Sequence, residues 1–234
     1  MADRPLFIPS TEGNSLVKTE YVTFQWFPGM HISQKQKSID SLHLSASSLR
    51  GWSNILEISS KSKSELGVAL SAFNLTFTTL RHQRTFSVEC AFQGSKVFEN
   101  GGPFTDIFEM TSREAKKDER LRTSGRLTGF WFFGYKWPLE PQTAFYDWLY
   151  INALNKQPLL VEQLLDYSAF TDIEFNPERS INCQAYSVAL YVSLCKRNLL
   201  MQALSSPESF LNLLSEKTIS NSRQDDTIQG RLDL

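Results

Sequence analysis

The chain has 234 residues, of which 41% are hydrophobic and 21% charged, a composition typical of ordinary globular proteins. Its formal net charge of −1 excludes a global positive field that would hold a polyanion, so any contact with nucleic acid must come from a local patch of cations. The N-terminus lacks the basic start and apolar run of a secretion signal, and no stretch approaches the roughly 18 apolar residues of a membrane span. We therefore expect a cytoplasmic protein with no membrane contact.

The residues best suited to binding zinc are few and dispersed: Cys90, Cys183, Cys195, His31, His43 and His82. The cysteines form no C-x-x-C pair, and the histidines form no H-E-x-x-H or H-x-H set. This spacing predicts neither a disulfide framework nor a zinc ribbon, and we expect no metal and no cofactor.

The first residues of the chain predict strands around one helix. Residues 1 to 19 are expected to form an irregular arm, and the alternation from Tyr21 to Phe27 predicts a half-buried strand. The segment from Ser33 to Leu49 has an amphipathic pattern that predicts a packing helix ended by Gly51. Asn54 to Ser59 is a short strand candidate.

An apolar stretch from Gly67 to Phe77 follows, and Arg84 to Phe86 is expected to pair back on it as a hairpin. Helical patterns dominate the rest of the chain. Strands in the first third and helices in the remainder predict an α+β fold.

The next segment, from Thr85 to Phe98 (TFSVECAFQGSKVF), predicts a helix capped by Ser87. Glu89, Phe92, Gln93 and Lys96 stand at i, i+3, i+4 and i+7, so they share one face. A helix that only had to pack would carry apolar groups there. The residues on the opposite side are small or apolar enough to pack inward, and if both sides are covered the two charges line a cleft. Alternatively, the pair is simply solvated.

Cations gather in the segment from Ser112 to Leu121, which predicts a surface helix with Ser112 as its N-cap. These cations are either solvated or contact a nucleic-acid backbone, and the interspersed acids dilute their charge. They are Arg113, Lys116, Lys117, Arg120 and Arg122. Lys35 and Lys37 on the earlier helix admit the same two interpretations.

The most aromatic segment runs from Gly125 to Trp137 (GRLTGFWFFGYKW). As a strand it would direct Phe130 and Phe132 to one face and Trp131 and Phe133 to the other. Most of these rings are expected in the core, while the glycines leave the segment flexible enough to line a pocket.

Helices are predicted in the last part of the chain at residues 140 to 154, from Pro158, at residues 182 to 200 and at 207 to 216, followed by a frayed tail. Between them, Phe170 to Phe175 alternates acidic and apolar residues, which predicts a strand with Asp172 and Glu174 on one face. Two acids on one face are either solvated or catalytic.

Three motifs resemble one family. The run from Glu89 to Lys96 (ECAFQGSK) resembles the E-x-x-F-Q-A-x-K helix of the NADAR superfamily, whose simpler members include the YbiA-like N-glycosidases. Leu70 to Asn74 (LSAFN) is similar to the family's L-S-N-F motif. Asp172 to Glu174, followed by Ser180 to Asn182, resembles its L-V-E strand ahead of a closing helix that opens with Asn.

One difference from the simpler members indicates which branch of that superfamily the chain resembles. The connection FNPERSI after Glu174 is shorter than the glycine-rich loop of the simpler members. The short connection, the N-terminal extension and the YDWLYINAL segment resemble the branch that accompanies DarT-type toxins, over about Pro5 to Leu214. The resemblance implies a mostly helical single domain, with a β-containing extension (1–66), a catalytic core (67–204) and a C-terminal helix and tail (205–234).

The resemblance also implies a reaction. Cleaving a bond between nitrogen and an anomeric carbon passes through an oxocarbenium-like state, which needs a carboxylate nearby and a group that handles the proton of the leaving nitrogen. We expect Glu89 to be the carboxylate and Glu174 or Asp172 its partner. Lys96 would either neutralise an anion or form a transient Schiff base. The residues expected to bind substrate are Ser71, Phe73, Phe92, Gln93, Arg126, Trp137 and Asn182, with Lys96 and Arg126 on the diphosphate and Trp137 as an aromatic platform.

The toxin-associated branch implies a hydrolase that removes ADP-ribose from the exocyclic amino group of guanine in DNA, acting as an antitoxin to an ADP-ribosyltransferase. Its substrate would be single-stranded DNA or a flipped base. One alternative is an N-glycosidase that acts on a free riboflavin-pathway intermediate, against which the short connection after Glu174 argues. Another is an antitoxin without catalysis that blocks the toxin by contact, for which Glu89 and Lys96 would be dispensable.

Overall fold

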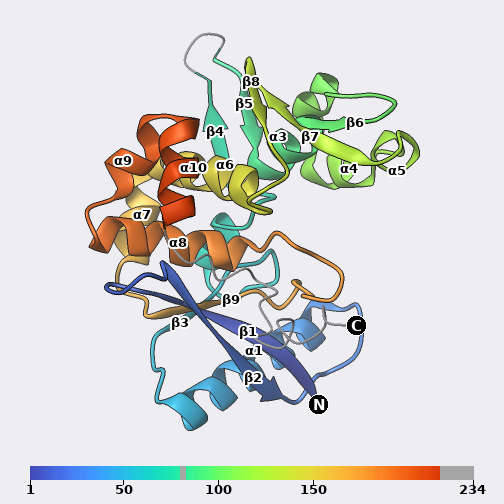
Figure 1. Ribbon diagram of the computed structural model, residues 1–234. Coiled ribbons are helices and arrows are strands. Elements are labelled where there is room, and N and C mark those ends of the chain that lie inside the picture. Colours follow the sequence, from blue (N-terminus) through green and yellow to red (C-terminus); the bar gives the residue numbers. More distant parts are fainter. Residues whose placement is uncertain (80–82, 217–234) are drawn as a thin grey trace, which may run out of the picture.

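A four-stranded sheet forms one side of the molecule in the computed structural model, which describes residues 1–79 and 83–216 (Figure 1). Its strands are β1 (Ala2–Pro9), β2 (Val17–Phe24), β3 (Ile55–Glu57) and β9 (Ala169–Thr171), in the order β2-β1-β9-β3. β1 and β2 are antiparallel along their whole length, and β3 runs parallel to β9. The sheet therefore joins strands from the first 57 residues to β9, whose Thr171 lies 114 positions after its partner Glu57.

Both faces of this sheet are covered, which explains why the predicted irregular arm is wrong. Leu6 and Ile8 of β1 pack toward α1 (Ile32–Arg50), while Phe7 packs edge-on against Tyr186 with ring centroids 5.6 Å apart. A strand buried on both faces has a continuous apolar run instead of an alternating one. The run PLFI therefore gives no period-2 signal, and β2 begins earlier and ends earlier than the predicted strand.

Helix α1 confirms the prediction of a packing helix. Ile39, Leu42 and Ala46 lie buried against the sheet. The helix ends at Gly51, whose positive φ of 70° is the left-handed conformation that favours glycine. The predicted strand around Ile55 is β3, and the predicted hairpin is the pair β4 (Thr76–Thr78) and β5 (Thr85–Ser87).

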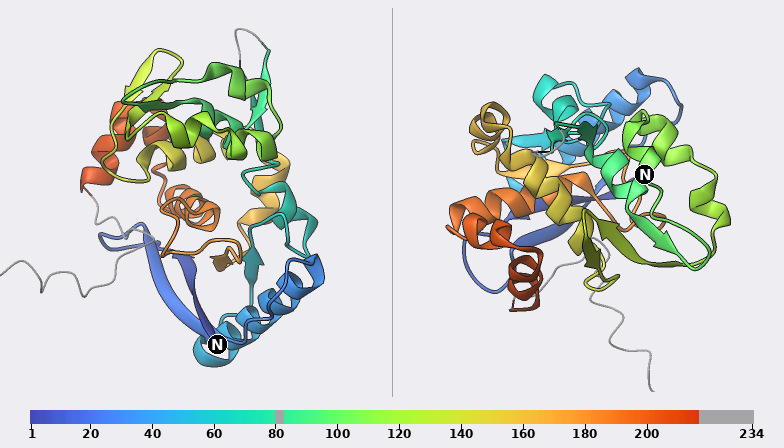
Figure 2. Two further views of the ribbon diagram at one scale, coloured as in Figure 1. Left: turned by 90° about the vertical axis from the view of Figure 1, so that its right-hand side faces the viewer. Right: turned by 90° about the horizontal axis from the view of Figure 1, so that it is seen from above.

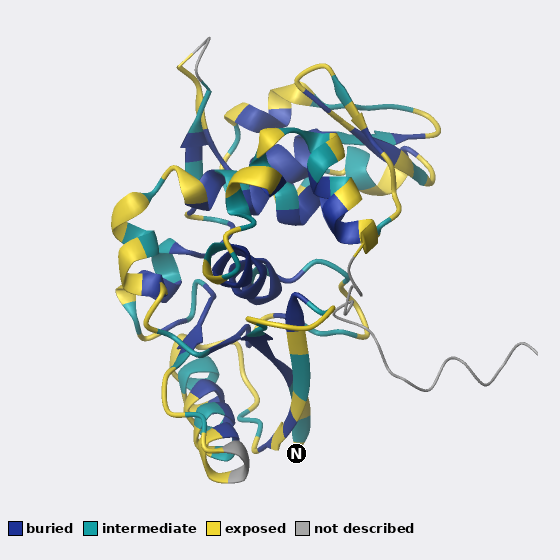
Figure 3. Cartoon of the chain, turned by 60° about the vertical axis from the view of Figure 1, so that its left-hand side comes forward, coloured by how far each residue is buried: buried dark blue, intermediate teal, exposed yellow. Residues whose placement is uncertain are grey.

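Helix α8 (Gln184–Lys196) lies at the centre of the core, between the four-stranded sheet and α6 (Ala144–Asn155) (Figure 2). Every residue from Ala185 to Leu194 is buried, as the dark coil in Figure 3 shows. The helix ends before the predicted boundary, and α9 (Leu200–Ser205) and α10 (Pro207–Glu216) follow. α10 has its predicted limits. The predicted frayed tail lies outside the described residues.

The central helix is shorter than predicted. α3 spans Val88–Gly94, and Lys96 is the first residue of strand β6 (Lys96–Phe98), where it pairs with Phe130. β6 joins β7 (Leu127–Phe132) and β8 (Tyr135–Trp137) in a three-stranded sheet. Pairing with β7 overrides the helical spacing, because Val97 and Phe98 favour a strand and Gly94 is a weak helix former.

Three other boundaries also differ from the predictions. The basic segment forms α4 (Ser112–Lys117) and α5 (Arg120–Thr123), and the N-cap of α4 is Thr111 rather than Ser112. α6 begins at Ala144, four residues after the predicted start. Short helices α2 (Glu65–Ala69), η1 (Thr105–Glu109) and α7 (Pro158–Leu164) complete the fold, and α7 begins at its predicted proline.

The predicted strand from Phe170 to Phe175 stops at Thr171. The Asp172 side chain causes this, because its Oδ1 accepts hydrogen bonds from the backbone N–H groups of Glu174 (2.9 Å) and Phe175 (3.2 Å). An aspartate that binds the backbone two residues on forms a turn. Asp172 and Glu174 therefore belong to a turn, which we call the acid turn (residues 172–175), and not to a strand.

Candidate functional site

A cavity of about 240 Å³ opens where α3, α4, α6 and the segment after β9 meet. Seven residues predicted from the sequence line it: Phe73, Glu89, Phe92, Gln93, Asp172, Glu174 and Asn182. Seven others complete the lining: Ala72, Lys116, Tyr146, Phe175, Ser180, Ile181 and Gln184. The structure thus brings the first two motifs together with the third, although Glu89 and Asp172 are 83 positions apart in the sequence.

Helix α3 presents its polar face to this cavity. Ser87 fixes the start of the helix by accepting a hydrogen bond from Cys90 N (3.1 Å). One turn further on, Gln93 Nε2 donates to Glu89 Oε1 over 2.9 Å, and both side chains are buried. A buried carboxylate that borders a cavity can act on a bound ligand, whereas a carboxylate in bulk water is screened.

Asp172 is the second buried carboxyl group of the lining, with 6% of its surface exposed. Burial and the nearby carboxyl of Glu57 raise its pKa well above the usual value, and the backbone hydrogen bond from Glu174 only partly offsets them. Its Oδ1 already accepts two backbone hydrogen bonds. Asp172 is therefore suited to keep a proton near neutral pH and to donate it.

Glu174 is more exposed and is held by a cation. Its Oε1 lies 3.2 Å from Lys35 Nζ on α1. The Lys35 ammonium also lies 4.7 Å from the centre of the Trp26 ring. The N-terminal extension thus contributes a residue that touches the wall of the cavity.

Two amide groups in the lining have an unused acceptor. Within the described part of the chain, Gln93 Oε1 and Asn182 Oδ1 are buried and have no hydrogen-bond partner. Buried acceptors usually find a donor, so these oxygens are suited to N–H or O–H groups of a ligand. Ser71 Oγ is buried without a partner too, although Ser71 stands next to the lining and is not part of it.

Hydrogen bonds fix the segment that carries Phe73. Gln184 Oε1 accepts from Ala72 N (2.8 Å), and Gln184 Nε2 donates to Ile58 O (2.7 Å). On the other side of the cavity, Ser112 Oγ donates to Phe73 O over 2.8 Å. The loop is thus tied to the start of α8 and to α4, which places the Phe73 ring at the wall.

Two lysines lie at the α3 end of the cavity. Lys96 stands beside the lining, with its ammonium 4.7 Å from the centre of the Phe92 ring. Burial lowers its pKa to about 8, Glu89 counteracts this shift and Lys116 adds to it. Lys116 lines the cavity itself, and its ammonium lies 5.3 Å from the Phe73 ring centre. The sequence indicated Lys116 only as one cation of a basic helix.

Two predicted residues lie away from the cavity. Arg126 is 82% exposed at its side chain and pairs with Glu99 at 3.2 Å. Trp137 is 1% exposed, packed against Phe145 and Trp148 with ring centroids 5.4 and 5.1 Å away. This burial leaves the indole of Trp137 no open face on which a ligand could stack, as the predicted aromatic platform would require. The rings that line the cavity are Phe73, Phe92, Tyr146 and Phe175.

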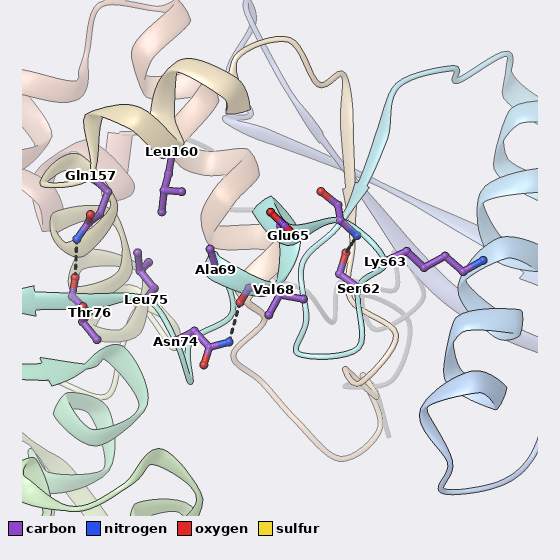
Figure 4. Close-up of a pocket in the computed structure, with 11 residues that line it drawn as sticks. Ser62, Lys63, Glu65, Val68, Ala69, Asn74, Leu75, Thr76, Gln157 and Leu160 are labelled. Atoms are coloured by element: carbon purple, nitrogen blue, oxygen red, sulfur yellow. Dashed lines mark hydrogen bonds between the residues drawn. The ribbon is translucent and has the colours of Figure 1, made fainter.

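A larger hollow of about 550 Å³ lies between α2, the loop before β4 and the start of α7 (Figure 4). Its lining contains one acid, Glu65. Lys63, its one cation, is already paired with Asp40 at 2.5 Å. Size alone does not make this hollow the better candidate, because its amides Asn74 and Gln157 already donate to the carbonyl oxygens of Val68 and Thr76.

Residues 1–79 and 83–216 contain neither a cluster of metal-binding side chains nor a membrane-spanning helix. No group of three or more histidine, cysteine, aspartate or glutamate side chains there could hold a metal ion. No helix in the same residues is long and apolar enough to cross a bilayer.

Comparison with protein families assigns the chain to a family. The model of the DarT1-associated NADAR antitoxin family matches residues 2–224. The chain belongs to that family. The resemblance noted in the sequence is thereby confirmed, and NADAR proteins are N-glycosidase-like hydrolases. None of the curated proteins with which the chain was compared matches it.

The sequence of this NADAR antitoxin gave little indication of three residues around the cavity. Tyr146 lies in a segment whose pattern predicts only a helix, and Lys116 in one that predicts a surface helix. Glu57, behind the acid turn, stands in a short apolar strand where a single acid suggests solvent exposure. Its burial at 2% exposed is a result of sheet pairing, which the local sequence does not reveal.

Proposed function

We propose that this NADAR antitoxin hydrolyses the bond between ADP-ribose and the exocyclic amino group of guanine in DNA, and so reverses the modification made by its partner toxin. The observation that supports this most is that two carboxyl groups in different environments line the same cavity. Glu89 and Asp172 both line it, and burial together with Glu57 favours the protonated form of Asp172.

The reaction needs one protonated carboxyl group and one charged carboxylate. As the bond from the anomeric carbon to the guanine nitrogen breaks, Asp172 gives its proton to that nitrogen and releases guanine with its amino group intact. The Glu89 carboxylate stabilises the positive charge that develops on the sugar. Water then adds to the anomeric carbon, and the proton it loses returns to a carboxylate. The products are ADP-ribose and unmodified DNA.

Lys96 has two possible roles in this scheme. As an ammonium it would neutralise an anionic part of the substrate. As a neutral amine it would attack the ring-opened anomeric carbon and form a Schiff base, which water later hydrolyses. The pKa of about 8 leaves a minority of neutral amine at pH 7, so Lys96 supplies both the ammonium and the amine form. Trapping with borohydride separates them, because only a Schiff base is reduced to a stable adduct detectable by mass.

Substrate contacts follow from the lining. The free oxygens of Gln93 and Asn182 would accept hydrogen bonds from ribose hydroxyls or from guanine N–H groups. The Phe73 and Phe92 rings would stack on flat or apolar parts of the ligand. Lys116 is better placed for the diphosphate than Arg126, because Lys116 lines the cavity while Arg126 pairs with Glu99.

An oligonucleotide that carries ADP-ribose on one guanine tests this function directly. We expect the protein to release ADP-ribose, followed by mass, and Glu89→Gln to lower the rate by about 10²–10³-fold while the fold is kept. Glu65→Gln is the matched control, because Glu65 lines the other hollow. Cleavage of a free riboflavin-pathway intermediate instead of the oligonucleotide would reassign the substrate. Full neutralisation of the toxin by Glu89→Gln would favour an antitoxin that acts by binding.

A further inference from the structure

The four-stranded sheet is connected to the cavity through β9, which pairs with β3 and leads directly into the acid turn. Glu57 stands opposite Thr171 in this parallel pair, and Ile58 N donates to Thr171 O over 2.8 Å. Thr171 is the residue before Asp172. The last residue of β3 therefore lies against the start of the acid turn.

Glu57 holds both neighbours of Asp172. Its Oε2 accepts a hydrogen bond from Thr171 Oγ1 (2.7 Å), and its Oε1 accepts from Ile173 N (2.8 Å). Ser59 Oγ also donates to Oε1, over 2.7 Å. One carboxylate thus fixes the backbone or side chain on either side of the proposed proton donor.

A histidine continues this chain of hydrogen bonds toward α1. His43 Nε2 lies 2.8 Å from Thr171 Oγ1. Because the single hydroxyl proton of Thr171 goes to Glu57, His43 must be the donor to Thr171, with its proton on Nε2. Burial lowers the pKa of His43 to about 4, so the ring is neutral at physiological pH and this arrangement persists.

The cost of Glu57 argues against a purely structural role. The side chain is 2% exposed, and no salt bridge to it exists among residues 1–79 and 83–216. Burying a carboxylate without a cation costs several kcal/mol, and a neutral residue of similar shape would pair the strands as well. A buried charge directly behind a cavity changes the protonation of the groups that line it, which a neutral residue would not do.

We propose that Glu57, supported by His43 and Thr171, is a positioning residue that orients Asp172 and keeps it in its proton-donating form. This inference rests on the proposed function. Two adjacent buried carboxyl groups cannot both be charged at low cost, so one keeps its proton. Burial raises the pKa of both carboxyl groups, and the three hydrogen bonds that Glu57 accepts partly offset this shift for Glu57. The charge of Glu57 adds to the effect of burial on Asp172, so the proton resides on Asp172.

Other charged and titratable groups also face Asp172 and influence its protonation together with Glu57. From β1, Arg4 attracts the Asp172 charge, while Glu174 in the same turn repels it. The remaining titratable neighbours are Cys183 ahead of α8 and Tyr146 and Tyr150 on α6. A variant at Glu57 leaves all of these in place, so its effect on the pH profile isolates the contribution of Glu57.

The test is the pH dependence of kcat/KM on the modified oligonucleotide, compared for wild type and Glu57→Gln. A general acid is active below its pKa, so activity falls on the alkaline side as Asp172 loses its proton. Removing the Glu57 charge makes ionisation of Asp172 easier, and we expect the alkaline limb to move about one pH unit or more toward acid. Activity at pH 8 should fall about tenfold, while activity at pH 5 to 6 changes less. Glu57→Asp, which keeps the charge, should restore part of the profile.

A second pair of variants covers the case in which Glu57→Gln does not fold. Thr171→Val removes the hydroxyl that links Glu57 and His43 with little change of shape, and Thr171→Ser keeps it. We expect Thr171→Val to lower kcat more than it raises KM, and Thr171→Ser to resemble wild type. Equal pH profiles for wild type and Glu57→Gln, or equal activity of the two Thr171 variants, would overturn the proposal. Failure of the wild type to cleave the oligonucleotide would instead refute the proposed function.

Discussion

Lys35 of α1 and Glu174 of the acid turn form a salt bridge of 3.2 Å between segments 139 positions apart. The lysine belongs to the N-terminal extension and the glutamate to the wall of the cavity. The Lys35 side chain is 20% exposed and rests on Trp26, which limits its freedom. The extension therefore helps to shape the cavity, in addition to closing the four-stranded sheet.

The salt bridge gives a first prediction. Lys35→Met should leave stability within about 1 kcal/mol of wild type, because partly exposed ion pairs contribute little. It should nevertheless lower kcat/KM on the modified oligonucleotide about three- to tenfold, since Glu174 is no longer held at the wall. Chemical denaturation and steady-state kinetics measure the two quantities. Lys37→Met is the control on the exposed side of the same helix, and an equal loss of activity there would contradict the prediction.

The unpaired amide oxygens give a second prediction. Asn182→Leu keeps the approximate shape of the side chain and removes the acceptor, so we expect KM to rise about tenfold with a smaller change in kcat. Asn212→Leu on α10, which is exposed and away from the cavity, serves as control. A loss confined to kcat would mean that Asn182 contacts the transition state rather than the bound substrate.

A buried acid in the core gives a third prediction, for stability against pH. Asp147 on α6 accepts a hydrogen bond of 2.6 Å from Ser187 Oγ, and burial raises its pKa to about 7. The folded state therefore holds a proton that the unfolded state has lost above about pH 4. The stability that this proton provides is fully present below about pH 4 and is lost progressively until pH has risen through 7.

Asp147→Asn removes this titration while it keeps the oxygen that accepts from Ser187. We expect the variant to be more stable than wild type at pH 8, by up to about 4 kcal/mol, and nearly equal to it near pH 4. Urea denaturation at several pH values measures the difference between the two proteins. A difference that does not change with pH would show that Asp147 is not the group responsible.

The end of α3 gives a fourth prediction. A Cβ added at Gly94 would stand 2.5 Å from Phe108 Cε1, because the helix approaches η1 closely there. Gly94→Ala should thus destabilise the protein by about 1–3 kcal/mol, although alanine favours helices by up to about 1 kcal/mol. Denaturation by urea measures the change. A gain in stability would indicate that Phe108 moves aside without cost.

Much of the candidate site could be predicted from the sequence. Phe73, the three residues on α3, the two acids of the turn and Asn182 all line one cavity, and they were indicated by spacing and by resemblance to the family. Short-range signals also located several helices, as with Gly51 after α1 and Pro158 at the start of α7. Caps, prolines and helical spacing act within a few residues, so a sequence displays them directly.

What only the tertiary structure decided depends on contacts between distant residues. β1 is a strand because it pairs with β2 and β9 and because two helices cover its faces. Lys96 belongs to a strand instead of α3 because β6 pairs with β7. The burial of Glu57 behind Asp172, which connects residues more than a hundred positions apart, also results from sheet pairing. Hydrogen bonds between strands and the exclusion of water arise only when the chain has folded, and no local pattern of residues encodes them.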